Sequence, residues 1–186
     1  MDAERAPKEV GSRINVVGTC GAGKATVARA LAERLGLVDV ELDALSWGPD
    51  WTMRPDDVFR AKVATAVAGD RWVVDGNYSK TRGIVWARAD TVVWLDYSFP
   101  RVFMRLVRRT LCRAFTREEL WHGNRESLRM SLLSRESILL WAIKTHRRRH
   151  REYSELVARP ENKHLVVVRL RCPRETARWL AGARSR

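Results

Sequence analysis

The stretch NVVGTCGAGKATVARAL, residues 15–31, joins a run of apolar strand-forming residues to an amphipathic helical pattern through a glycine-rich segment. It fits the pattern G-x-x-x-x-G-K from Gly18 to Lys24, directly after a predicted strand and directly before a predicted helix. Glycines at 18, 21 and 23 let the backbone curl so that its N–H groups face phosphate oxygens, and the helix N-terminus adds positive dipole. Lys24 can then reach the terminal phosphates. The alternative is a glycine-rich turn with an exposed lysine, but the register of strand, loop, lysine and helix favours phosphate binding.

Ala25 stands where such loops normally place a Ser or Thr that gives an oxygen to Mg²⁺. Thr26 is no automatic replacement, since one residue along a helix rotates the side chain by about 100°. We expect its hydroxyl to contact a nearer phosphate instead. Because Mg²⁺ is held partly by water and substrate oxygens, both a weakened and an abolished metal site stay open.

Short runs rich in Val and Ile alternate with longer amphipathic stretches along the chain, a pattern typical of a parallel sheet covered by helices. The predicted strands are 14–18, 37–42, 71–76, 91–96 and 164–170, and the predicted helices are 24–36, 54–69, 99–115 and 171–183. Residues 115–150 carry no strand signal and predict two further helices inserted before the last strand. The fold class is therefore α/β.

The length of 186 residues fits one domain, predicted at 13–182, with residues 1–12 as a loose charged tail. No apolar run approaches the roughly 20 residues that span a bilayer, and the first residues lack the apolar stretch of a secretory signal. We therefore expect a cytoplasmic protein with no membrane partner. The three cysteines, Cys20, Cys112 and Cys172, are widely spaced and form neither a disulfide framework nor a zinc motif.

The net charge of +13 is concentrated in residues 101–151, which hold 14 Lys and Arg against 4 Asp and Glu. Such a block binds nucleic acid, binds an anionic small molecule, or forms a solvated helix face. Arg105 and Arg109 lie four residues apart on one helix, so they can act together on transferring phosphates. The phosphate-binding pattern elsewhere in the chain favours that interpretation over a solvated basic face.

Two carboxylates follow predicted strands, at the edge of a parallel sheet where ligands gather. Asp75 holds Mg²⁺ through water or orients the attacking group, and the absence of a returning strand after Gly76 disfavours a hairpin turn. Asp43 either accepts a proton from a substrate hydroxyl, assists the metal, or caps a helix. Other candidates for the acceptor crevice are Trp47, Trp51, Gly76, Asn77, Tyr78 and Arg82. For the two tryptophans, stacking on a substrate ring competes with packing between segments.

The motifs GTCGAGKAT, LDALSW, WVVDGNY, ADTVVWLDY, RLVRRT, LWHGNRESL and LVVVRLRCPRETARWL together resemble the adenylate-kinase-like P-loop proteins called topology modulation proteins, over about residues 13–182. The resemblance implies a three-layer α/β/α P-loop NTPase sandwich with a five-stranded parallel sheet in the order 2-3-1-4-5 and a helical lid at about 115–150. It implies ATP and Mg²⁺ as cofactors. Carried over, the nucleotide-binding residues are Gly18, Cys20, Gly21, Ala22, Gly23, Lys24, Ala25, Thr26, Arg171 and Arg174. The stretch DGNY departs from the acceptor signature of adenylate kinases, so AMP is not implied as acceptor.

These observations predict an ATP-dependent kinase that acts on a small-molecule acceptor the sequence does not identify, with Lys24, Asp75, Asp43, Arg105 and Arg109 as catalytic residues. Since Ala25 replaces the metal-binding hydroxyl, the alternative is a nucleotide-binding regulatory protein with little catalysis. Nucleic-acid binding through residues 101–151 is a third hypothesis.

Overall fold

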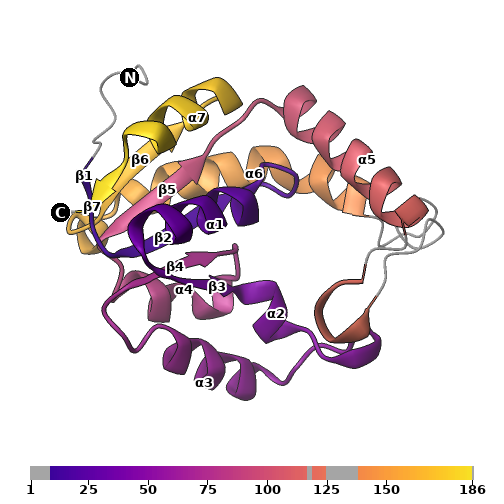
Figure 1. Cartoon of the computed structure of the whole chain (residues 1–186), viewed down its shortest axis with the longest axis horizontal. Helices are drawn as coiled ribbons and strands as arrows, with labels where there is room; N and C mark the ends of the chain where they lie inside the picture. The colour runs from indigo at the N-terminus through magenta and orange to yellow at the C-terminus, as the bar shows by residue number, and fades with distance from the viewer. Residues whose placement is uncertain (1–8, 117–118, 125–137, 186) are drawn as a thin grey trace.

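The computed structural model of the protein describes residues 9–116, 119–124 and 138–185, without the side chains of 113–115, 138–141 and 185 (Figure 1). The strands of the main sheet are β2 (Arg13–Gly18), β3 (Val38–Glu41), β4 (Trp72–Asp75), β5 (Thr91–Leu95) and β6 (Val166–Leu170). The α-helices are α1 (Lys24–Leu35), α2 (Leu42–Ser46), α3 (Asp56–Ala66), α4 (Ser79–Trp86), α5 (Phe99–Thr116), α6 (Ile138–Ala158) and α7 (Pro173–Gly182). Short 3₁₀ turns are η2 (Pro49–Trp51), η3 (Trp121–Gly123) and η5 (Pro160–Asn162), and two-residue strands are β1 (Glu9–Val10) and β7 (Arg184–Ser185).

The main sheet is parallel, with the strand order β3-β4-β2-β5-β6. Counted among these five strands alone, the order is 2-3-1-4-5, which confirms the predicted α/β class. The strands β4 and β5 are buried along their whole length, as β-branched and aromatic residues covered on both faces should be. Because all five strands run in one direction, their carboxyl ends meet at one edge of the sheet.

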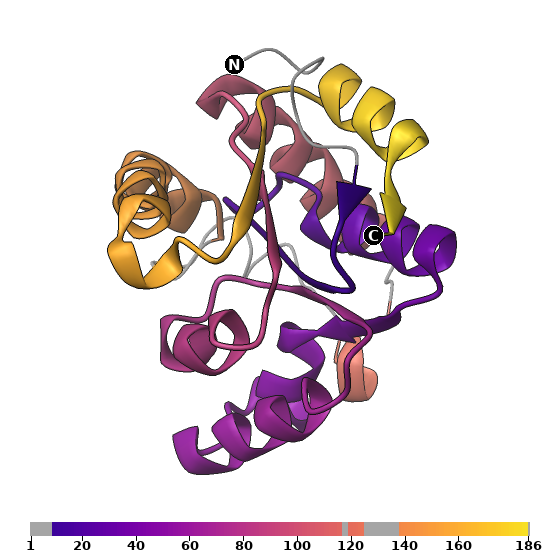
Figure 2. The ribbon, with the colours of Figure 1, turned by 90° about the vertical axis from the view of Figure 1, so that its left-hand side faces the viewer.

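Helices cover both faces of the sheet (Figure 2). On one face, α1 and α7 enclose a core that includes Leu31 and Trp179, which are 0% and 2% exposed. On the other face, α3, α4 and α6 enclose a second core around Phe59, Trp86 and Tyr153. The three layers leave the carboxyl edge of the sheet as the place where loops from all strands gather.

The predicted loose tail at residues 1–12 is wrong for its last part. Glu9 and Val10 form β1, which pairs in parallel with β7 in the register Glu9 to Arg184. Val10 is fully buried, and the Asp90 carboxylate accepts hydrogen bonds from the N–H groups of Ser12 and Arg13 at 3.1 and 3.0 Å. Residues 1–8 lie outside the described part of the chain.

The segment predicted as a lid, about 115–150, is described only in part. Its described residues form the end of α5, the turn η3 and the first half of α6, while residues 117–118 and 125–137 lie outside the description. The helices α2 and α4 were not expected from the sequence. Within the described residues, no helix is long and apolar enough to cross a membrane.

Candidate functional site

The glycine-rich loop lies between β2, the central strand, and the first turn of α1. Gly23 caps α1 with a φ of 92° and supplies no side-chain hydrogen bond, so the first N–H groups of the helix stay open to a ligand. Within the loop, the buried Ala22 donates its N–H to the Thr19 carbonyl at 3.1 Å. The hydroxyl of Thr19 is buried without a hydrogen-bond partner among the described residues. A curled backbone with unpaired N–H groups at a helix start is a typical arrangement for binding an anion.

The helix α5 packs directly against this loop. Gly21 has a φ of 84°, and a Cβ there would stand 2.8 Å from the carbonyl oxygen of Val102. Only glycine permits that approach. Close packing of α5 on the loop brings two arginines of the helix to it.

Arg105 and Arg109 both reach the loop, as their four-residue spacing predicts. A Cβ on Gly23 would lie 2.8 Å from Nη2 of Arg105, and Nη2 of Arg109 lies 3.9 Å from Sγ of Cys20. The Nε of Arg109 is buried without a hydrogen-bond partner among the described residues. No described acid forms an ion pair with either arginine or with Lys24, the first residue of α1. The loop amides and these three cations therefore lie without an ion pair to a described acid, although Lys24 still interacts with the nearby Asp75 beyond ion-pair distance.

Carboxylates face this cationic side from the ends of β3 and β4. Asp75 ends β4, is 8% exposed, and lies in register with Val16 and Glu41. Burial raises the pKa of Asp75 to about 7; nearby Lys24 lowers it, while Asp43, Glu41 and Asp39 raise it. A buried carboxyl that exchanges a proton near neutral pH, next to a lysine of a phosphate-binding loop, is typical of a functional site.

Asp43 lies in the first turn of α2, next to the end of β3. Its Oδ1 accepts a hydrogen bond of 2.6 Å from the hydroxyl of Tyr78. Burial and the nearby Asp43 charge raise the pKa of Tyr78, so its hydroxyl stays protonated and donates. One oxygen of Asp43 is thus held in place by Tyr78.

The predicted aromatic pair Trp47 and Trp51 packs edge to face at 5.6 Å between ring centroids. The segment around η3 docks on the same place: Asn124 accepts a hydrogen bond from the N–H of Trp51 at 2.9 Å and donates one to the carbonyl of Gly48 at 2.8 Å. These contacts support the packing role that competed with substrate stacking.

The docked segment also reaches the carboxyl edge of the sheet. Trp121 Nε1 donates to Glu41 Oε2 at 2.7 Å, and the other oxygen of Glu41 pairs with Arg29 at 3.1 Å. Glu41, Trp121 and Asn124 were not predicted as site residues. Their contacts join positions about 80 residues apart, so no short stretch of sequence indicates them.

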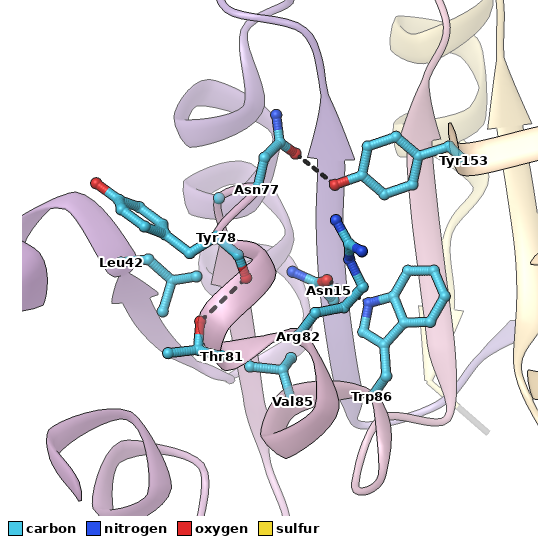
Figure 3. Close-up of a pocket in the computed structure, with 10 residues that line it drawn as sticks. Asn15, Leu42, Asn77, Tyr78, Thr81, Arg82, Val85, Trp86 and Tyr153 are labelled. Atoms are coloured by element: carbon cyan, nitrogen blue, oxygen red, sulfur yellow. Dashed lines mark hydrogen bonds between the residues drawn. The ribbon is translucent and has the colours of Figure 1, made fainter. Parts of the chain in front are cut away.

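The residues after β4, 76–82, contact both the Asp43 side of the sheet edge and helix α6. Asn77, Tyr78 and Arg82 line one small cavity. Figure 3 shows the Tyr78 ring directed away from Trp86 and Tyr153, while Asn77 and Arg82 are directed toward Tyr153 of α6. Arg82 pairs with Glu152 of α6 at 2.5 Å, and its guanidinium lies 5.6 Å from the Tyr153 ring. The cavity volume is about 10 Å³, the room of one water molecule. Gly76, Asn77, Tyr78 and Arg82 therefore line one cavity, in keeping with the single crevice expected from the sequence, while the Tyr78 hydroxyl bonds to Asp43.

The remaining predicted nucleotide contacts lie on the surface. Arg171 and Arg174 are exposed at the carboxyl end of β6 and the start of α7, and the Arg171 N–H donates to Glu175 at 2.6 Å. Ala25 and Thr26 occupy the first turn of α1, with Thr26 exposed. Within the described residues, no cluster of three or more acids, histidines or cysteines could hold a metal ion by itself.

Comparison with known proteins identifies the fold. No protein-family model matches the sequence, and none of the curated proteins does. Among solved structures, the chain is similar to a gluconokinase from Sinorhizobium meliloti 1021, with 21% identity, 93% of each chain covered and a TM-score of 0.50. It is also similar to shikimate kinase from Acinetobacter baumannii in complex with shikimate, with 17% identity, 93% of this chain and 91% of that chain covered, and a TM-score of 0.56.

A shikimate kinase from Bacteroides thetaiotaomicron gives 13% identity, 91% and 94% coverage of the two chains, and a TM-score of 0.55. At such identities the likeness shows the fold alone. It confirms the fold that the resemblance implies, while membership of the topology modulation group stays a prediction. The chain has the five-stranded α/β fold of P-loop kinases.

Proposed function

We propose that the protein is an ATP-dependent phosphotransferase that acts on a small-molecule acceptor. One observation carries the proposal: Lys24, Arg105 and Arg109 lie at a curled glycine-rich loop without an ion pair to a described acid. Asp75 lies near Lys24, beyond ion-pair distance, and near Asp43. Phosphoryl transfer needs this division, because cations must neutralise the transferring group while a carboxylate orients the attacking hydroxyl. The similar gluconokinase and shikimate kinase structures, both kinases of small molecules by name, add support.

The residues present fit a nucleoside triphosphate. The open N–H groups at the start of α1 and the orphaned donors Thr19 Oγ1 and Arg109 Nε suit phosphate oxygens, and Lys24 adds a point charge. Arg171 and Arg174, exposed after β6, are proposed to contact the base, as the resemblance implies. When bound, Mg²⁺ would supply further neutralisation of phosphate charge.

The fit for Mg²⁺ is weaker than the fit for phosphate. Ala25 offers no oxygen at the start of α1, so Asp75 is the protein group proposed to hold the ion, through water. Because the pKa of Asp75 is about 7, this carboxyl is only partly ionised at neutral pH. Metal affinity should therefore rise as the pH increases through 7.

On the acceptor side, Asp43 is proposed to accept the proton of the attacking hydroxyl. Tyr78 donates to its Oδ1 and fixes the orientation of the carboxylate, which leaves Oδ2 as the proton acceptor. Asp43, Trp47, Trp51 and Tyr78 form the proposed acceptor wall. Asn77 and Arg82, which face α6, are proposed to support the site from behind.

A second candidate function is nucleotide binding with little catalysis, in which a partner recognises the bound state. Ala25 favours it, since the loop can hold phosphates without a hydroxyl for the metal. Both functions predict that the protein binds nucleotide, but only the first predicts turnover of ATP.

The test is a screen of sugars, polyols, hydroxy acids and nucleosides with ATP and Mg²⁺, monitored by ADP release. Lys24→Ala should abolish ATP binding and turnover, while Lys62→Ala, an exposed lysine on α3, should leave both unchanged. Unchanged ATP affinity in Lys24→Ala would refute the phosphate-binding role. ATP binding without acceptor-stimulated ADP release would favour the regulatory function.

A further inference from the structure

The pairing between β2 and β4 ends at Val16 and Asp75, two residues before β2 itself ends at Gly18. In a parallel sheet, the N–H and C=O groups of alternate residues point to the same neighbouring strand. Val16 of β2 faces β4, because its carbonyl accepts a hydrogen bond from the Gly76 N–H at 3.3 Å. Gly18, two residues further, therefore faces the place where β4 would continue. Yet β4 ends at Asp75, so the backbone of Gly18 has no strand beside it on that side.

The side chain of Asn77 occupies this place. Its Oδ1 accepts a hydrogen bond from the Gly18 N–H at 3.2 Å, and its Nδ2 donates to the Gly18 carbonyl. The side-chain amide thus makes both bonds that a neighbouring strand would make. On the opposite side, Gly18 lies in register with Leu95 of β5, and a Cβ on Gly18 would meet the Leu95 carbonyl at 2.7 Å.

The orientation of the Asn77 amide is set by a third residue. The Tyr153 hydroxyl, on α6, donates to the same Oδ1 at 2.9 Å, as Figure 3 shows. Two donors then face one end of the amide and a carbonyl faces the other, so a flipped amide would lose both bonds to Gly18 and the acceptor of the Tyr153 proton. Tyr153 is 1% exposed, and burial raises its pKa, so its hydroxyl remains a donor.

We propose that Asn77 is a positioning residue for the phosphate-binding loop, held in its working orientation by Tyr153. Gly18 is the last residue of β2 and the first of the glycine pattern, so fixing its peptide fixes the start of the loop. Clamped between Leu95 and Asn77, the loop presents its N–H groups without reordering when phosphate arrives, which is the usual source of affinity in a preorganised site. The consequence for nucleotide affinity rests on the proposed function, whereas the order of the loop does not.

The first measurement is amide hydrogen exchange of the protein without nucleotide. Asn77→Ala should speed exchange of the Gly18 N–H about tenfold or more relative to the amides of β5, because its protecting hydrogen bond is gone. Tyr153→Phe keeps the ring and removes one donor, so it should give a smaller change of about two- to fivefold at the same amide. This variant decides the matter if Asn77→Ala does not fold.

Asn15→Ala is the matched control. Asn15 is also buried in the sheet, where it donates to the Val74 carbonyl at 3.0 Å and accepts from Trp86 Nε1 at 2.8 Å, but its side chain makes no hydrogen bond to Gly18 within the described part of the chain. It should lower the midpoint of thermal unfolding and leave the exchange of Gly18 unchanged relative to β5. Equal loosening of Gly18 in Asn15→Ala and Asn77→Ala, or no loosening in Asn77→Ala and Tyr153→Phe, would overturn the proposal.

The second measurement is calorimetric titration with ADP. Where the wild type binds, Asn77→Ala should raise the ADP dissociation constant about tenfold, and Asn15→Ala should not change it. Equal ADP affinity in Asn77→Ala would contradict the positioning role. If the wild type binds neither ADP nor ATP, the proposed function fails, and the exchange experiment still decides whether Asn77 holds the loop.

Discussion

Replacing Asp75 with asparagine should make the protein more stable, by an amount that grows as the pH rises above about 4 and is largest at neutral to alkaline pH. Burial raises the pKa of Asp75 from 3.8 to about 7, which means that the folded protein disfavours the ionised carboxylate. At about 1.36 kcal/mol per pKa unit, the rise corresponds to about 4 kcal/mol of folding free energy lost when Asp75 is fully ionised. Asparagine has nearly the same shape and never ionises, so the variant avoids that loss.

The number of protons bound by the folded and unfolded states determines how the free energy of unfolding changes with pH. Below pH 3.8 the carboxyl is protonated in both states, and wild type and variant should differ only by a pH-independent amount. Between pH 3.8 and 7 the folded wild type keeps a proton that the unfolded chain releases, so its stability falls as the pH rises. Above pH 7 the full loss of about 4 kcal/mol applies. The difference in the free energy of unfolding, Asp75→Asn minus wild type, should therefore grow steadily from pH 4 to pH 8.

Urea unfolding followed by tryptophan fluorescence measures this difference, since the chain has eight tryptophans. An unfavourable amide contact in the variant costs about 1–3 kcal/mol but shifts the whole curve equally, so the slope with pH is the diagnostic quantity. Asp70→Asn is the control, because the Asp70 side chain is 88% exposed and its replacement should give a nearly flat curve. If the difference in unfolding free energy between Asp75→Asn and wild type did not change between pH 4 and pH 8, the inference that burial raises the pKa of Asp75 would be refuted.

Three further changes test the site and the fold. Ala25→Ser should tighten ATP binding in Mg²⁺ relative to binding without metal by about tenfold in titration calorimetry, and an unchanged ratio would contradict the assignment of this position to the metal. Arg109→Ala should lower acceptor-dependent ADP release about 100-fold, whereas Arg101→Ala, exposed on the same helix, should not; equal effects would remove Arg109 from the site. Val10→Ala should cost about 2 kcal/mol of unfolding free energy, against almost nothing for the 62% exposed Val38→Ala, and a loss near zero would show that β1 contributes no stability.

Local patterns in the sequence predict most of the main sheet and the helices that cover it. Runs such as those that form β4 and β5 are apolar because both faces of those strands are buried, so each strand is visible within a few residues. The glycine loop and Lys24 follow from short-range chemistry in the same way. Arg105 and Arg109 were predictable because a spacing of four places both on one side of a helix, here the side that faces the loop.

The parts that sequence analysis missed depend on contacts between distant segments. β1 and β7 are two residues each, and they exist only because the fold brings Glu9 next to Arg184, 175 positions away in the chain. The docking of Asn124 on Gly48 and Trp51 joins positions more than 70 residues apart. The orientations of the Asn77 and Arg82 side chains could not be predicted either, since they depend on contacts with Tyr153 and Glu152 on α6.

The pairing of β1 with β7 has a practical consequence for engineering the chain. Because the two strands run parallel and in register, residues 9 and 185 lie only about 6 Å apart, given a rise of about 3.3 Å per residue and a strand spacing of about 4.8 Å. A linker of a few glycines and serines should join them without distortion. New ends could then be opened at the exposed turn of Gly69 and Asp70, which would give a circular permutant with the loop, the arginines and both carboxylates in their present arrangement.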